Sequence, residues 1–169
     1  MHRLRFALLL LLPPMPALGQ ASSPRANPCG APEHRQFDFW IGQWEVQLPD
    51  GSKAGTNRIE PILGGCALRE SWSGMAGGTG HSYNVYDRSR KLWHQTWVDS
   101  RGNLLQLEGG FVGGRMTLQG KSRHSTGAPV LNRIVWWMTA PGRVRQLWET
   151  SQDGGTTWTV AFDGRYIKR

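Results

Sequence analysis

The amino-acid sequence predicts an all-β protein, an antiparallel up-and-down β-barrel of about ten strands with a short N-terminal helical turn. The 22 glycines include pairs such as Gly64-Gly65, Gly109-Gly110 and Gly154-Gly155, and such pairs mark turns. The stretches between the pairs are short and rich in tryptophan and β-branched residues, which is typical of strands. After residue 21, the sequence lacks a stretch of a dozen residues with the periodicity of an amphipathic helix.

The expected elements follow from these turn signals, taken in chain order. A helical turn is expected over Glu33–Trp40, and Pro61 predicts a bulge or a strand end within the second strand. Antiparallel strands joined by short turns leave exposed edges unless the sheet closes, so a barrel is favoured and a sandwich is the alternative. The expected strands are Gln43–Leu48, Ala54–Leu63, Ala67–Gly74, Gly80–Tyr86, Leu92–Ser100, Leu104–Val112, Arg115–Ser122, Val130–Ala140, Arg143–Ser151 and Thr157–Lys168.

The first residues have the pattern of a signal peptide. Arg3 and Arg5 precede an unbroken apolar run over Phe6–Leu12, which is too short to cross a membrane. Small residues that follow it fit cleavage after Gly19 or after Ala21. An uncleaved membrane anchor is the alternative interpretation.

Cleavage divides the chain into a signal peptide over 1–21, a flexible leader over 22–32 and a single domain over 33–169. The remaining length suits one domain with one core. We therefore expect a periplasmic or secreted protein without an integral membrane segment after processing.

The charge of the chain is basic but scattered. Removing Arg3 and Arg5 from the 20 basic residues leaves 18 against 12 acidic ones, a net charge of +6. Nucleic-acid binding would need a continuous basic face or a recognition motif, so no nucleic-acid partner is expected. The basic residues lie at strand ends and turns, among them Arg58, Arg69, Arg88, Arg90, Lys91, Arg115, Lys121, Arg123, Arg143 and Arg145.

The two cysteines are Cys29 and Cys66. In an oxidising compartment such a pair predicts a disulfide. Closing the long loop between them would contribute about 4 kcal/mol in the chain-entropy account. The disulfide would tie the N-terminal segment to the body of the domain.

The pattern Gly42-x-Trp44 at the first expected strand resembles the signature of the lipocalin and fatty-acid-binding (calycin) barrels. The resemblance implies that Trp44 closes one end of the barrel. It also implies that a basic residue near the last strand, Arg165 or Arg169, packs on the indole ring, a contact of about 0.5–2 kcal/mol.

A broader set of motifs resembles a bacterial family of exported calycin-like proteins, the domain of unknown function numbered 1579 or a close relative. The likeness covers residues 33–169 and implies a lipocalin-like barrel without implying a reaction. Its motifs are Phe37-Asp38-Phe39-Trp40-Ile41-Gly42-x-Trp44, Gly64-Gly65-Cys66, Glu70-x-Trp72, Ser82-x-Asn84-x-Tyr86-Asp87 and Trp93-x-Gln95-x-Trp97-x-Asp99.

A separate motif, Ser151-x-Asp153-x-Gly155-x-Thr157-Trp158, resembles the Asp-box of sialidases and other propellers. Sialidase chemistry would need an arginine triad and several repeated blades, whereas this chain has a single box. We expect Asp153 to accept hydrogen bonds from turn amides, with Trp158 packed beneath the turn.

The candidate ligand site comes from period-two alternation, which places every second side chain on one face of a strand. Aromatic and uncharged polar residues share these faces, as small-molecule pockets require. A packed core with hydrogen bonds at the strand ends is the structural alternative. The predicted ligand-binding residues are Trp72, Asn84, Tyr86, Gln95, Trp97, Asp99, Gln146 and Trp148.

Metal, cofactor and catalytic motifs are absent from the sequence. The histidines after the signal, His34, His81, His94 and His124, lack zinc-ligand spacing. A haem site like that of the nitrobindin-like calycins would need a histidine on a late strand, and residues 130–169 contain none. We therefore predict no cofactor and no metal.

Three functions are compatible with these sequence features. The first is the binding of a small hydrophobic or amphipathic molecule in an aromatic-lined cavity. The second is an enzyme that uses the same cavity, with Asp99 or Glu70 as general base. The third is a structural or interaction barrel with a filled core.

Overall fold

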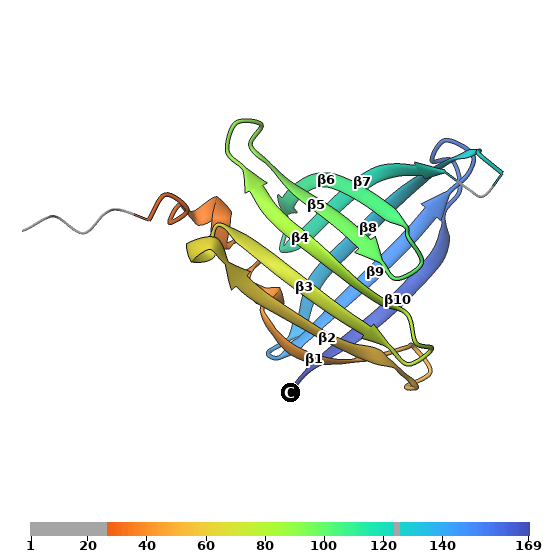
Figure 1. The fold of residues 1–169 in the computed structure, drawn as a ribbon, viewed down its shortest axis with the longest axis horizontal. Helices are drawn as coiled ribbons and strands as arrows, with labels where there is room; N and C mark the ends of the chain where they lie inside the picture. Colours follow the sequence, from red (N-terminus) through yellow and green to blue (C-terminus); the bar gives the residue numbers. More distant parts are fainter. Residues whose placement is uncertain (1–26, 124–125) are drawn as a thin grey trace, which may run out of the picture.

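A computed structural model describes residues 27–123 and 126–169, and within them ten strands form a closed barrel (Figure 1). Each strand pairs antiparallel with its neighbours in the chain, and β1 pairs with β10 to close the sheet. The strands are β1 (Gly42–Gln47), β2 (Lys53–Ile62), β3 (Ala67–Gly74), β4 (Thr79–Asp87), β5 (Leu92–Asp99), β6 (Leu104–Val112), β7 (Arg115–Arg123), β8 (Pro129–Ala140), β9 (Arg143–Ser151) and β10 (Thr159–Lys168).

This architecture confirms the predicted fold class, an antiparallel up-and-down barrel with a short helical turn. Most strand ends lie within one residue of their predicted positions, while β10 begins at Thr159. It starts late because the preceding turn is held by Asp153, whose carboxylate accepts the backbone N–H of Thr157 at 2.9 Å. The predicted signal peptide over 1–21 lies outside the described residues.

The Asp153 turn has the structural role that the sequence predicts. The carboxylate also accepts the hydroxyls of Ser151 at 2.7 Å and Thr157 at 2.6 Å. These hydrogen bonds favour the ionised form and lower the pKa of Asp153. Trp158 donates from Nε1 to the Gly155 carbonyl at 3.0 Å, so the motif closes the β9–β10 hairpin.

The N-terminal segment closes one end of the barrel (Figure 1). It contains the short 3₁₀ helices η1 (Pro32–Arg35) and η2 (Asp38–Trp40). Phe37 and Trp40 are fully buried, with ring centroids 4.9 Å apart in a stacked arrangement. Phe37 also lies 5.7 Å from the Trp93 ring and 5.3 Å from the Trp136 ring. The segment therefore supplies the aromatic floor of the barrel interior.

Trp44 lies at the same end and is 2 % exposed, as the calycin resemblance implies. It donates from Nε1 to the Trp40 carbonyl at 2.9 Å. The cation near its ring is Lys168, with Nζ 5.7 Å from the ring centroid. The expectation of Arg165 or Arg169 was wrong in this detail, because Arg169 instead bonds the Glu45 carboxylate at 3.1 Å.

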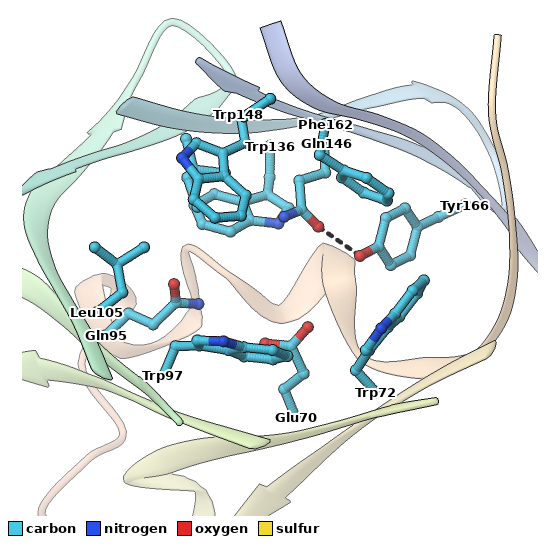
Figure 2. A pocket seen from close by; sticks show the side chains of 12 residues that line it. Glu70, Trp72, Gln95, Trp97, Leu105, Trp136, Gln146, Trp148, Phe162 and Tyr166 are labelled. Carbon is cyan, nitrogen blue, oxygen red and sulfur yellow. Dashed lines mark hydrogen bonds between the residues drawn. The ribbon is translucent and has the colours of Figure 1, made fainter. Parts of the chain in front are cut away.

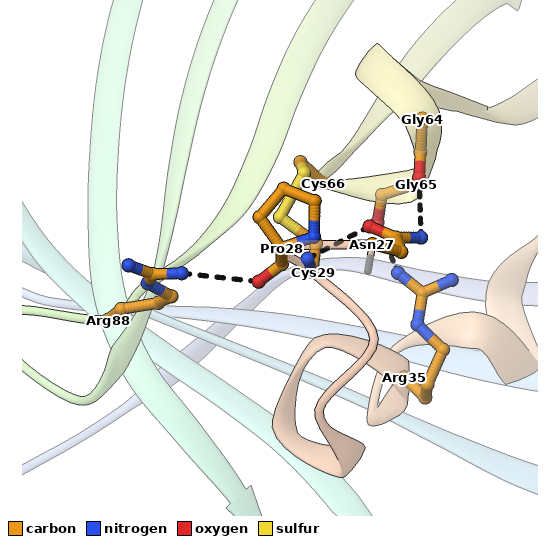
Figure 3. Close-up of a disulfide and its surroundings, with 8 residues drawn as sticks. All are labelled: Asn27, Pro28, Cys29, Arg35, Gly64, Gly65, Cys66 and Arg88. Atoms are coloured by element: carbon orange, nitrogen blue, oxygen red, sulfur yellow. Dashed lines mark hydrogen bonds between the residues drawn. A yellow bond between two sulfur atoms is a disulfide. The ribbon is translucent and has the colours of Figure 1, made fainter. Parts of the chain in front are cut away.

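The predicted disulfide joins Cys29 to Cys66, directly after the 3₁₀ helix η3 (Leu63–Gly65) (Figure 3). Asn27 strengthens the attachment by donating from Nδ2 to the Gly64 carbonyl at 3.1 Å. Arg35 donates to the Gly65 carbonyl. Residues 27–35 are thus fastened to the β2–β3 connection.

Within residues 27–123 and 126–169, no helix has the length and apolar character that a bilayer crossing requires.

Candidate functional site

A cavity of about 220 Å³ lies inside the barrel (Figure 2), and its lining residue Trp136 packs on Phe37, with ring centroids 5.3 Å apart. Ala161 in its lining is exposed, which marks the side where the cavity reaches solvent. Half of its lining residues are aromatic. The lining residues are Glu70, Trp72, Gln95, Trp97, Leu105, Ile134, Trp136, Gln146, Trp148, Ala161, Phe162 and Tyr166.

Two glycines make room for two of these rings: Gly80 on β4, next to the strand of Trp97, and Gly164 on β10, the same strand as Phe162. A Cβ added at Gly80 would lie 2.2 Å from the Trp97 ring, and one at Gly164 would lie 2.5 Å from the Phe162 ring. Because real Cβ atoms do not approach that closely, each ring lies directly over bare backbone. The glycines therefore let large aromatic side chains lie along the wall.

Glu70 is the polar centre of the site. It is 5 % exposed, and both of its carboxylate oxygens accept hydrogen bonds. Asn57 Nδ2 donates to Oε1 at 2.7 Å, and Ser82 Oγ donates to Oε2 at 2.6 Å. The strand register explains the second bond, since Glu70 and Ser82 are directly paired across β3 and β4.

A second layer of amides supports Ser82. Asn84 Nδ2 donates to Ser82 Oγ at 2.9 Å, and Gln95 Nε2 donates to Asn84 Oδ1 at 2.8 Å. Asn84 and Gln95 are paired across β4 and β5. These bonds run in one direction, from Gln95 through Asn84 and Ser82 to Glu70.

The network continues to the opposite wall through Tyr166 (Figure 2). Asn57 Nδ2 lies 3.2 Å from the Tyr166 hydroxyl, which donates to Gln146 Oε1. The Gln146 amide nitrogen has no hydrogen-bond partner among the described residues. It therefore remains available as a donor to a ligand.

Burial determines the protonation of this network. Desolvation raises the pKa of Glu70, opposed by the hydrogen bonds from Ser82 and Asn57 and by the charge of His81. Desolvation also raises the pKa of Tyr166, with the nearby Glu70 charge as a second cause. Among the ion pairs of the described residues, none includes Glu70. Among the described residues, the Glu70 carboxylate therefore has no cationic side chain in ion-pair contact with it, although His81 Nδ1 lies 3.3 Å from the Glu70 backbone carbonyl.

Five of the eight predicted ligand-binding residues line the cavity, and a sixth lies behind its wall. Asn84 is fully buried and contacts the cavity through Gln95 and Ser82. The lining residues that the sequence predicts are Trp72, Gln95, Trp97, Gln146 and Trp148. Their role in ligand binding stays a prediction.

Tyr86 and Asp99 lie elsewhere. Tyr86 packs at the closed end, 5.2 Å from the His34 ring and 6.1 Å from the Trp93 ring. Asp99 lines a neighbouring recess of about 280 Å³ that shares Trp72 and Trp97 with the cavity. Its carboxylate accepts the backbone N–H of Arg101 at 2.9 Å and that of Asn103 at 3.0 Å. Asp99 thus holds the β5–β6 turn.

Several lining residues were not predicted from the sequence. Trp136 and Tyr166 are nearly fully buried and close the wall opposite β3. Phe162 packs edge-on against Trp72 at 6.0 Å. Alternation along β10 could have indicated Phe162 and Tyr166, since Gly164 lies between them on the same face.

Metal-binding clusters of three or more acidic, histidine or cysteine side chains are not found within residues 27–123 and 126–169. His34 is buried, and burial lowers its pKa, with the charges of Arg35 and Arg88 as further causes. His124 lies outside the described residues.

The fold and the cavity together define an up-and-down β-barrel with an aromatic-walled internal cavity and a buried carboxyl group. Compared with known proteins, the chain matches no family model and no curated protein sequence.

Proposed function

We propose that this protein is an exported binding protein that holds a small, mainly apolar ligand inside the barrel. The observation that carries the proposal is the unfilled cavity of about 220 Å³ between aromatic walls. An apolar cavity of about 150 Å³ holds a benzene molecule, so this volume suits a ligand of one ring or a short branched chain. Gln95 and Gln146 would orient its polar groups.

Export is part of this proposal. The Cys29–Cys66 disulfide supports it, because such bonds persist in oxidising compartments. The N-terminal charge and apolar run support it as well.

A second candidate function is an enzyme that acts on a small apolar substrate. The raised pKa of Glu70 favours it, because a buried carboxyl group that faces a cavity is suited to proton transfer. Glu70 would be the general base and Tyr166 a neutral hydrogen-bond donor. This candidate requires turnover, whereas the binding protein requires only reversible occupancy.

Blocking the cavity mouth tests the binding function. Ala161→Trp places an indole at the exposed edge of the lining and is expected to weaken ethylbenzene binding by at least about tenfold, or 1.4 kcal/mol. Isothermal titration of the purified protein measures the dissociation constant. Val160→Trp is the matched control, since Val160 is 56 % exposed and outside the lining, and should change affinity less than about twofold.

Equal affinities in the two variants would place ethylbenzene outside the cavity. The absence of binding to the unmodified protein, across alkylbenzenes and short alcohols, would contradict the proposed function.

A further inference from the structure

The acidic side chains of the described residues differ sharply in their surroundings. Glu45, Glu60 and Glu149 all form ion pairs with arginine near the surface. Glu70 is the buried one, and it has no ion pair within the described part of the chain. A buried carboxylate is costly unless a positive charge or strong hydrogen bonds compensate it. The Glu70 carboxylate accepts two such hydrogen bonds. The described residues do not supply a positively charged partner for it.

The donors around Glu70 are arranged for the ionised carboxylate. Ser82 Oγ accepts a hydrogen bond from Asn84 Nδ2 at 2.9 Å and lies 3.5 Å from Gln95 Nε2. Because these two groups are donors, the hydroxyl hydrogen of Ser82 points to Glu70. Asn57 Nδ2 faces the other oxygen. Both oxygens therefore meet donors from the protein, and each keeps a lone pair for a further partner.

Aromatic rings border the remaining approach to this carboxylate. Figure 2 shows the Glu70 carboxylate between the side chains of Trp72 and Trp97, with Trp148 and Phe162 on the facing wall. Ring faces attract cations through their quadrupole, and the attraction is strongest where water is excluded from the contact. A carboxylate within an aromatic wall is the combination that recognises ammonium groups.

We propose that the cavity binds a small organic cation, with its ammonium group against Glu70 and between the rings of Trp72 and Trp97. This inference rests on the proposed binding function and names the class of its ligand. A cavity of about 220 Å³ accommodates a substituted ammonium with a short polar tail. The Gln146 amide nitrogen is available to a hydroxyl on that tail.

Two isosteric probes test the charge requirement in the full processed protein. Choline carries a permanent positive charge, and 3,3-dimethylbutan-1-ol has the same shape with a neutral carbon in place of nitrogen. We expect choline to bind at least about tenfold more tightly than the neutral alcohol, as measured by tryptophan fluorescence and isothermal titration. Glu70→Gln should abolish this preference while it leaves the affinity for the alcohol within about twofold.

Glu60→Gln is the charge-matched control. It removes the same negative charge from the outer face of the barrel, where Glu60 pairs with Arg58 and Arg69, and should keep the preference for choline. The comparison of the two probes on the unmodified protein needs no variant, so a folding defect in Glu70→Gln would not block the test.

The possible results separate this inference from the function on which it rests. If the neutral alcohol binds as tightly as choline, or if the preference survives Glu70→Gln, the cation assignment is overturned and the binding function stands. If neither probe nor ethylbenzene binds, both are overturned. A preference for choline that depends on Glu70 supports both.

Discussion

Truncation of Phe37 to alanine is expected to destabilise the protein by about 3–5 kcal/mol. The ring is fully buried and contacts Trp40, Trp93 and Trp136, which come from the N-terminal segment, β5 and β8. Its removal leaves a void at the junction of these elements, and the barrel closure limits how far the walls can move inward. Equilibrium unfolding in urea measures the change.

Val112→Ala provides the comparison for this substitution. Val112 is also apolar and ends β6, but it is 81 % exposed, so its truncation should change stability by less than about 0.5 kcal/mol. If Phe37→Ala cost no more than Val112→Ala, the N-terminal segment would not be a packed floor of the barrel.

Replacing both Cys29 and Cys66 by serine is expected to lower stability by about 4 kcal/mol. The two residues are 37 positions apart, and opening this loop gives the unfolded chain more conformational freedom. Loss of the disulfide releases the N-terminal attachment of the segment that carries Phe37 and Trp40, since Cys29 precedes this segment in the chain (Figure 3). Thermal unfolding with and without a reducing agent measures the effect.

The reducing agent supplies the control for the cysteine variant. Reduction should lower the stability of the unmodified protein to that of the serine variant and should leave the variant unchanged. A serine variant as stable as the oxidised protein would show that the hydrogen bonds of Asn27 and Arg35 hold the segment without the disulfide.

The sequence allowed the fold and the inward faces of the strands to be predicted, because glycine pairs mark turns and alternation fixes the face of each residue. It did not determine the height of a residue along the barrel axis. Tyr86 and Asp99 share faces with lining residues, yet each lies near a strand end: Tyr86 at the closed end and Asp99 at a turn. The alternation of side chains tells which face a residue is on, but it does not tell how far along the barrel axis the residue lies.

The hydrogen-bond network depends on contacts that alternation cannot give. Glu70 meets Asn57 diagonally across β2 and β3, and Asn57 reaches Tyr166 on β10, 109 positions along the chain. These contacts require the barrel to close between β1 and β10 and require the curvature to bring the inner faces together. Local sequence patterns do not encode either distance, so the contact between Asn57 and Tyr166 was not predicted.

Glu70 is itself buried and lacks a counter-ion among the described residues, and the proposed ligand class depends on both properties. Its uncharged neighbours are Asn57 on β2, Ser82 on β4 and Gln95 on β5, and the titratable groups nearby are His81 and Tyr166. Since burial raises its pKa above the ordinary value of 4.5, the folded protein holds a proton that the unfolded chain has released only at a pH between these two pKa values. Stability therefore falls as the pH rises from the ordinary pKa through the raised one, and Glu70→Gln removes this dependence.

Nuclear magnetic resonance titration of the Glu70 side-chain carboxyl carbon tests these two properties most directly. We predict an inflection above pH 4.5 that is absent from the spectrum of Glu70→Gln and shifts to lower pH when choline is bound. An inflection at or below the ordinary value in the free protein would show a hydrated or charge-paired carboxylate and would contradict a shielded, unpaired Glu70.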